Sequence, residues 1–151
     1  MKTKHKKTWI VVADGARARI FLNKGPGTGL VPALDHDLTG STLTSHEIGS
    51  DRPGVTFSSA GPGRHAMAPR TDPQQHAEHE FIKQVAKAIK GGLDQHAFEQ
   101  IILVAPPKAL GDLRADLDPR ALKLVTSELH KDLTHLSPHQ LGEHLQGVLK
   151  I

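Results

Sequence analysis

Apolar residues in the first quarter of the chain are spaced as they are in β-strands. Residues 8–13 form a continuous run rich in β-branched side chains, which predicts a strand buried on both faces. The turn pair Asp14-Gly15 follows, and residues 16–22 then alternate small apolar with basic side chains before becoming fully apolar. This pattern predicts a β-hairpin. Residues 30–38 mix apolar and polar side chains and predict a third strand, which Pro32 places at a sheet edge.

From residue 72 onward the apolar spacing changes to the helical period. Asp72 is a suitable helix cap, Pro73 suits the first helical position, and apolar side chains recur at helical spacing through residues 81–89. We expect the pair Gly91-Gly92 to end this helix. Residues 98–105 contain a second continuous apolar run, which predicts another buried strand.

The remaining third of the chain predicts two helices and one short strand. Asp118-Pro119 repeats the cap pattern, and the helix that it opens has an apolar face formed by Leu122, Val125 and Leu129. Residues 132–136 predict a short strand. A capping box with proline at the first helical position, Ser137-Pro138-His139-Gln140, then begins a last helix, whose apolar face is Leu141, Leu145 and Val148.

These elements predict one domain over residues 1–151 with the order β-β-β-α-β-α-β-α. A meander followed by alternating helices and strands favours the α/β class, with a mixed sheet and helices covering its faces. Right-handed crossovers place the strand within residues 98–105 beside the first strand. This order of elements is that of a ribonuclease-H-like mixed sheet.

Residues 38–72 stand apart as one long segment between the third strand and the first helix. Glycine, proline, serine and threonine dominate it, and a structureless stretch of this length inside a compact domain is usually functional or disordered. We predict a long flexible loop that contacts a partner. Its glycines allow close backbone approach, and its basic groups can contact phosphate. The candidate nucleic-acid contacts are Arg52, Gly61, Gly63, Arg64, His65 and Arg70.

Composition narrows the classes of protein to which this chain can belong. Its 151 residues are 37% hydrophobic and 23% charged, which is typical of one globular domain. Cysteine is absent, which excludes disulfides, thiol catalysis and cysteine-bound zinc. The apolar run after residue 8 is too short for a signal peptide, and no run approaches the length of a membrane span. We therefore expect a cytoplasmic protein with no membrane partner.

The charge of the chain permits attraction to nucleic acid. The formal net charge is +3, and residues 1–7 form a basic tail. The lysines of this tail either bind RNA phosphates or keep a disordered terminus soluble; they are Lys2, Lys4, Lys6 and Lys7.

No complete metal-binding pattern occurs in the sequence. Zinc needs three or four ligands, and the pairs His76 with His79 and His135 with His139 lack an evident third ligand. Surface or capping roles suit these histidines better, so we expect no metal site.

Catalytic patterns are also incomplete. A nuclease of this fold needs clustered carboxylates to hold Mg²⁺. Asp14 and either Glu78 or Glu80 are suitably placed, but the strand within residues 98–105 ends without a carboxylate. The next aspartates are expected in a loop; they are Asp112, Asp116 and Asp118. No Gly-x-Ser-x-Gly occurs, and no Gly-x-Gly-x-x-Gly joins the first strand to a helix. We predict no catalytic residues and no cofactor.

Three blocks of sequence carry a resemblance to a known family. WIVVADGARARIF near the start and ILVAPPKALGDLRADLDPRALKLV later look like the bacterial host-attachment protein family, and KDLTHLSPHQLGEHL near the end fits the same pattern. The resemblance covers nearly the whole chain. Members are known as proteins required for attachment to host cells, a description that implies a phenotype and no mechanism.

A wider resemblance is to the middle domain of archaeo-eukaryotic class-1 translation release factors. In that family a meander is followed by a long catalytic loop carrying Gly-Gly-Gln, then basic residues and a helix. The corresponding stretch of this chain is residues 60–70, AGPGRHAMAPR, and residues 76–86 resemble the helix that follows. Gly-Gly-Gln itself does not occur in the chain.

The two resemblances together imply a non-enzymatic cytoplasmic module that binds RNA or the ribosome through its long basic loop. Two alternatives stay open. The first is an enzyme, either a hydrolase acting on peptidyl-tRNA or a metal-dependent nuclease. The second is a factor that acts directly in attachment to host cells, which would require export.

Overall fold

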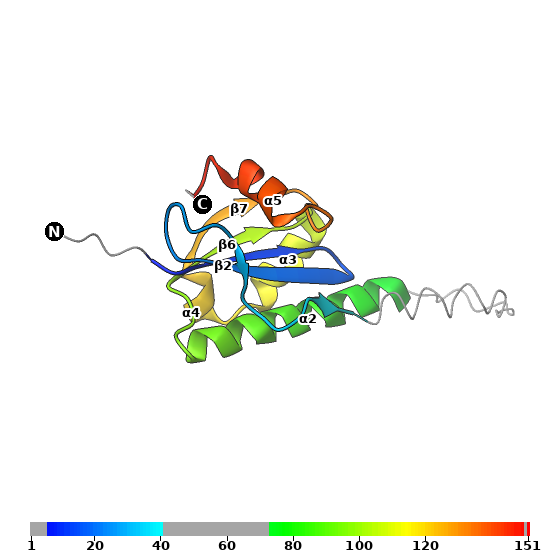
Figure 1. Ribbon diagram of the computed structural model, residues 1–151. Helices are drawn as coiled ribbons and strands as arrows, with labels where there is room; N and C mark the ends of the chain where they lie inside the picture. The colour runs from blue at the N-terminus through cyan, green and yellow to red at the C-terminus, as the bar shows by residue number, and fades with distance from the viewer. Residues whose placement is uncertain (1–5, 41–72, 150) are drawn as a thin grey trace, which may run out of the picture.

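A six-stranded mixed β-sheet forms the middle of the molecule (Figure 1). The computed structural model describes residues 6–40, 73–149 and 151. The strands of the sheet are β1 (Thr8–Ala13), β2 (Arg17–Asn23), β3 (Val31–Pro32), β4 (Leu38–Thr39), β6 (Gln100–Val104) and β7 (Val125–Leu129). Their order across the sheet is β3-β2-β1-β6-β7, and β4 also pairs with β2.

β1 is the central strand of the sheet, and its apolar composition explains this position. All of its residues are buried, as a continuous apolar run predicts. It pairs antiparallel with β2 across the turn at Asp14-Gly15, and parallel with β6, where Ile10 lies opposite Ile102. The predicted doubly buried strand, the hairpin and the position of β6 beside β1 are therefore confirmed. β7 pairs in parallel with β6 at the outer edge.

Helices cover both faces of the sheet, and alternate residues of β1 reach different cores. Trp9 and Val11 face α2 (Pro73–Asp94), α3 (Pro107–Asp116) and α4 (Pro119–Leu122). Ile10 and Val12 face α5 (Pro138–Leu145). Figure 1 shows this helix on the side of the sheet opposite α2. This arrangement confirms the predicted mixed α/β architecture. Among the described helices, none is both long and apolar enough to cross a membrane.

α2 begins at Pro73 as predicted, but the prediction of its end is wrong, because Gly91-Gly92 continues the helix. The last turn closes with a hydrogen bond from Ala97 N–H to the carbonyl of Gly92 (2.8 Å). His96, with a φ of 56°, supplies the left-handed conformation that this type of helix end requires. Gly92 serves packing, because a Cβ at this position would overlap the ring of Trp9.

The segment between β6 and α5 differs most from the prediction. Residues after Pro106 were expected in a loop, but Pro107 occupies the first position of α3, which the sequence did not predict. The helix expected from Asp118 is only the single turn of α4, and residues 125–129 form β7 instead. The strand expected at residues 132–136 does not form. The third parallel strand therefore comes one segment earlier than predicted.

The sequence of β7 lacks the alternating pattern of a strand, and the reason is its irregular pairing with β6. The register shifts between Ile101 and Ile102, so that Val125 lies opposite Ile101 while Ser127 lies opposite Ile102. An extra residue of this kind disrupts the alternation that identifies a strand in sequence. β7 is also half-buried at the sheet edge, so it needs no continuous apolar run. Tertiary pairing with β6 decides the conformation of these residues.

Two smaller expectations also change. The third strand predicted at residues 30–38 is replaced by two strands of two residues each, β3 and β4, which both pair with β2. Pro32 does lie at the sheet edge.

The last helix begins with the predicted capping box of Ser137 and Gln140. Val148 lies beyond the end of this helix and is 40% exposed, so it is not part of its buried face.

One surface cluster of charges joins α2 to α4. Arg120 Nη2 lies 3.1 Å from Asp94 Oδ1 and 3.2 Å from Asp118 Oδ2. The hydrogen bond from Lys90 and those from Arg120 lower the pKa of Asp94, and hydrogen bonds from Arg120 lower the pKa of Asp118. Because the Arg120 side chain is 60% exposed, solvent screens these pairs, and they add little to stability.

Candidate functional site

The carboxyl ends of the three parallel strands meet at one edge of the sheet. Asp14 follows β1, Pro106 lies just beyond β6, and His130 follows β7. In open α/β sheets, ligands commonly bind outside this edge. The side chains that the edge brings together are therefore the first candidates for a functional site.

Asp14 fixes the turn between β1 and β2. Its Oδ1 accepts hydrogen bonds from the backbone N–H groups of Ala16 and Arg17, both at 2.8 Å. An aspartate that accepts from the backbone two and three residues on is a standard turn-forming residue. The hairpin turn predicted at Asp14-Gly15 is therefore confirmed. Its second oxygen, Oδ2, remains available for contacts with other parts of the chain.

Thr134 connects Asp14 with the loop that follows β7. Its side chain is buried, and its Oγ1 lies 3.2 Å from Asp14 Oδ2 and 2.8 Å from Asp132 Oδ1. A hydroxyl group carries one proton, so it can donate to only one of these carboxylates at a time. Two carboxylates thus share one donor at the carboxyl edge, although 118 residues separate them (132 − 14).

His135 completes a group of three potential metal ligands. One ring nitrogen of His135 and one oxygen each of Asp14 and Asp132 all lie within 4.8 Å of one another. Carboxylates and imidazole are ligands of divalent cations such as Mn²⁺. In the described part of the chain, no group of this kind includes His76 or His79. Asp132 was not recognised from the sequence because residues 132–136 were predicted as a strand.

Arg19 holds the loop that carries Asp132 and His135. Its Nη1 donates to the carbonyls of Thr134 (3.2 Å) and Leu136. Its guanidinium also lies over the ring of Phe21, with the Cζ atom 5.0 Å from the ring centre. Arg19 therefore connects β2 to the loop that follows β7.

A small hollow of about 180 Å³ lies next to this group, between the β1–β2 turn, α2 and α3. Its polar lining includes Glu78, Lys108 and Asp112. Asp112 lies on α3 and not in a loop as predicted, and it pairs with Lys108 at 3.4 Å. Glu78 approaches Gly15 so closely that a Cβ there would lie 2.8 Å from the carboxyl carbon. Of the expected carboxylates, Glu78 and Asp112 therefore line this hollow, and Asp14 lies in the neighbouring group.

The predicted nucleic-acid contacts lie outside the described residues. They are Arg52, Gly61, Gly63, Arg64, His65 and Arg70. The structure does describe both flanks of the segment 41–72. Gly40 N–H donates to the Ala16 carbonyl at 2.9 Å, and α2 begins at Pro73, about 8 Å along the helix from Glu78. Both flanks therefore lie near the β1–β2 turn at the carboxyl edge.

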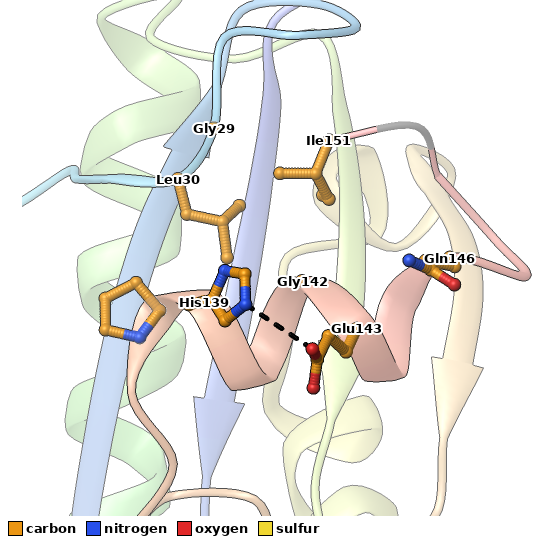
Figure 2. Close-up of a pocket in the computed structure, with 8 residues that line it drawn as sticks. Gly29, Leu30, His139, Gly142, Glu143, Gln146 and Ile151 are labelled. Carbon is orange, nitrogen blue, oxygen red and sulfur yellow. Dashed lines mark ion pairs between the residues drawn. The ribbon is translucent and has the colours of Figure 1, made fainter.

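A second hollow, of about 350 Å³, lies beside α5 (Figure 2). Across one turn of the helix, His139 Nε2 lies 3.4 Å from Glu143 Oε2. His135 and His139 are close in sequence but belong to different surfaces, because His135 faces Asp14 and Asp132. The lining residues of the hollow are Gly29, Leu30, Pro138, His139, Gly142, Glu143, Gln146 and Ile151.

The fold and the turn at its carboxyl edge are those of an α/β domain with a long insertion before its first helix. Residues 9–145 match the family described as "Protein required for attachment to host cells". The chain belongs to this family, as its sequence blocks predicted.

Comparison with individual proteins shows a similarity to a solved structure. No curated protein matches the chain. Among solved structures, the chain is similar to the crystal structure of the archaeal translation termination factor aRF1, with 13% sequence identity and a TM-score of 0.49. The alignment covers 93% of this chain and 38% of the factor, so the chain spans well under half the length of that protein.

Proposed function

We propose that this family member is a non-enzymatic, cytoplasmic module that binds RNA, free or within the ribosome, through the segment between β4 and α2. The distribution of charge in the sequence carries this proposal. Residues 52–71 include Arg52, Arg64 and Arg70 and contain no aspartate or glutamate. Phosphate contacts of this kind supply most of the affinity in sequence-independent nucleic-acid binding.

The balance of charges at the described edge of the sheet supports this proposal. Arg17 and Lys131 lie near the edge and form no ion pair within the described part of the chain. The negative charges of Asp14, Glu78 and Asp132 offset the positive charges of these two residues. The edge itself thus offers no excess of positive charge, whereas residues 52–71 carry three arginines and no carboxylate. Attachment to host cells would then be an indirect effect of RNA binding.

Salt dependence tests this proposal. Replacing Arg52, Arg64 and Arg70 together with alanine should make the fall of log affinity with log salt concentration less steep by about 2, since each single-strand phosphate contact contributes about 0.7 to its steepness. The measurement is RNA binding and ribosome co-sedimentation between low and high salt. A matched control removes the same charge at three exposed lysines without ion pairs in the described chain, Lys24, Lys87 and Lys123.

The control should keep the slope of the unmodified protein. If both triple variants lost the same amount of salt dependence, the affinity for RNA would depend only on net charge. That result would contradict a contact by residues 52–71. Absence of RNA binding and co-sedimentation by the unmodified protein at every ionic strength would refute the proposal as a whole.

The group formed by Asp14, Asp132 and His135 favours metal-dependent phosphodiester cleavage as a second candidate function. If this is correct, RNA cleavage should require Mn²⁺ or Mg²⁺ and stop with chelator. Asp132→Asn should reduce cleavage at least about a hundredfold, because it removes a charged ligand but retains an oxygen that accepts from Thr134. Asp112→Asn, outside the group, is the control. Lack of cleavage with either metal would exclude this candidate and leave the binding proposal intact.

A further inference from the structure

Asp14 and Asp132 bring two negative charges together beside the β1–β2 turn. One oxygen of each carboxylate and one ring nitrogen of His135 all lie within 4.8 Å of one another. In the described part of the chain, neither aspartate forms an ion pair with a lysine, arginine or histidine. Like charges at such a separation repel each other, and a cation bound between them offsets this repulsion.

Hydrogen bonds already fix the direction of both carboxylates. Asp14 Oδ1 accepts from the backbone N–H groups of Ala16 and Arg17. Asp132 Oδ1 accepts from the backbone N–H of Thr134 at 3.2 Å and from its hydroxyl at 2.8 Å. Carboxylates that bind metal ions are commonly held by hydrogen bonds of this kind. Because the two side chains are ordered in advance, binding of an ion costs less conformational entropy.

The imidazole of the group belongs to a loop that is held on both sides. Arg19 Nη1 donates to the carbonyls of Thr134 and Leu136, the residues immediately before and after His135. The backbone of His135 is therefore fixed close to the two carboxylates. Both His135 and Asp132 are exposed, so an ion can reach the group from solvent without unfolding the loop.

The types of ligand atom determine which ions suit the group. Carboxylate oxygens suit Mg²⁺, Ca²⁺ and Mn²⁺, whereas an imidazole nitrogen suits transition metals. Mg²⁺ prefers oxygen ligands and keeps several of its waters, so the ring of His135 adds little to its binding. The mixed set of two oxygens and one nitrogen therefore favours Mn²⁺, or another divalent transition-metal ion, over Mg²⁺. Such an ion would join two segments that lie far apart in the sequence.

We propose that Asp14, Asp132 and His135 bind one divalent transition-metal ion, which fastens the loop of residues 130–136 to the β1–β2 turn. This role is structural, so it depends neither on RNA binding nor on RNA cleavage. Mn²⁺ binding by a protein that does not cleave RNA would support this site while excluding the nuclease.

Titration of the full chain with Mn²⁺, followed by the electron paramagnetic resonance signal of the free ion, measures binding directly. One ion per chain should bind, at least about tenfold more tightly than Mg²⁺ in competition. Asp132→Asn and His135→Ala should each weaken Mn²⁺ binding at least about tenfold. His135→Ala should also reduce the preference for Mn²⁺ over Mg²⁺, because it removes the nitrogen ligand. Both replaced residues are exposed, so the fold should stay intact, which melting curves check.

His139→Ala is the matched control, because this exposed imidazole also has a carboxylate nearby, that of Glu143 at 3.4 Å. Mn²⁺ binding should be unchanged in this variant. Bound Mn²⁺ should also slow hydrogen exchange in residues 130–136 of the unmodified protein but not of Asp132→Asn. Equal binding by all variants would show an adventitious ion only and would overturn the proposal. Absence of binding at millimolar Mn²⁺, or binding that leaves exchange in the loop unchanged, would overturn it as well.

Discussion

Replacing Arg19 with alanine should lower the free energy of unfolding by about 3 kcal/mol. The guanidinium donates to the carbonyls of Thr134 and Leu136, and hydrogen bonds to a charged group contribute about 1.5–3 kcal/mol each. The side chain is only 18% exposed, so water cannot fully replace it. Its loss also removes the contact with the ring of Phe21. Denaturant titration of the purified variant measures the change.

Arg120→Ala is the matched control for this prediction. Arg120 takes part in two ion pairs, but its side chain is 60% exposed, so the cost should stay below about 1 kcal/mol. Hydrogen exchange adds a local readout, because Arg19→Ala should increase exchange in residues 130–136 more than in β1. Equal destabilisation by the two substitutions would show that Arg19 does not hold this loop.

Substitutions of two adjacent glycines in α2 should change stability in opposite directions. Gly92→Ala should destabilise the protein by about 1–3 kcal/mol, because the new methyl group overlaps the ring of Trp9. That ring also packs against Phe98, with the ring centres 4.7 Å apart, so it cannot easily move. Gly91→Ala should stabilise the protein by about 0.5–1 kcal/mol, since a Cβ there meets no atom within 4 Å.

Thermal and denaturant unfolding of both variants give the two values. The pair controls for helix propensity, because both positions lie in the same helix and receive the same residue. A gain in stability for both substitutions would mean that the Trp9 ring adjusts to the added methyl group. A loss for both would mean that Gly91 needs its freedom to form the last turn of the helix.

Local signals in the sequence were sufficient for several elements of the fold. A continuous apolar run identified β1, because only a strand with both faces covered needs apolar residues at successive positions. The turn pair Asp14-Gly15 defined the hairpin, and Ser137 with Gln140 defined the start of α5. In each case the residues that form the signal also make the contacts, so no distant part of the chain is required.

Other elements depended on contacts that no local pattern records. α3 follows two prolines that suggest the end of a strand, and β7 is irregularly paired and half-buried. The intrinsic preferences of such residues are weak, so tertiary packing decides their conformation. Gly91-Gly92 wrongly indicates the end of α2 for the same reason. Gly92 is required by the close contact of its backbone with the Trp9 ring, which lies far away in the sequence.

The sequence by itself therefore determined the α/β class, the central hairpin and the family to which this chain belongs. It also fixed the charge of residues 52–71, on which the proposed RNA contact rests. Only the tertiary structure brought Asp14 together with Thr134, 120 residues later, and with Asp132 and His135. The physical reason is the parallel arrangement of β1, β6 and β7, which places the carboxyl ends of distant segments at one edge of the sheet.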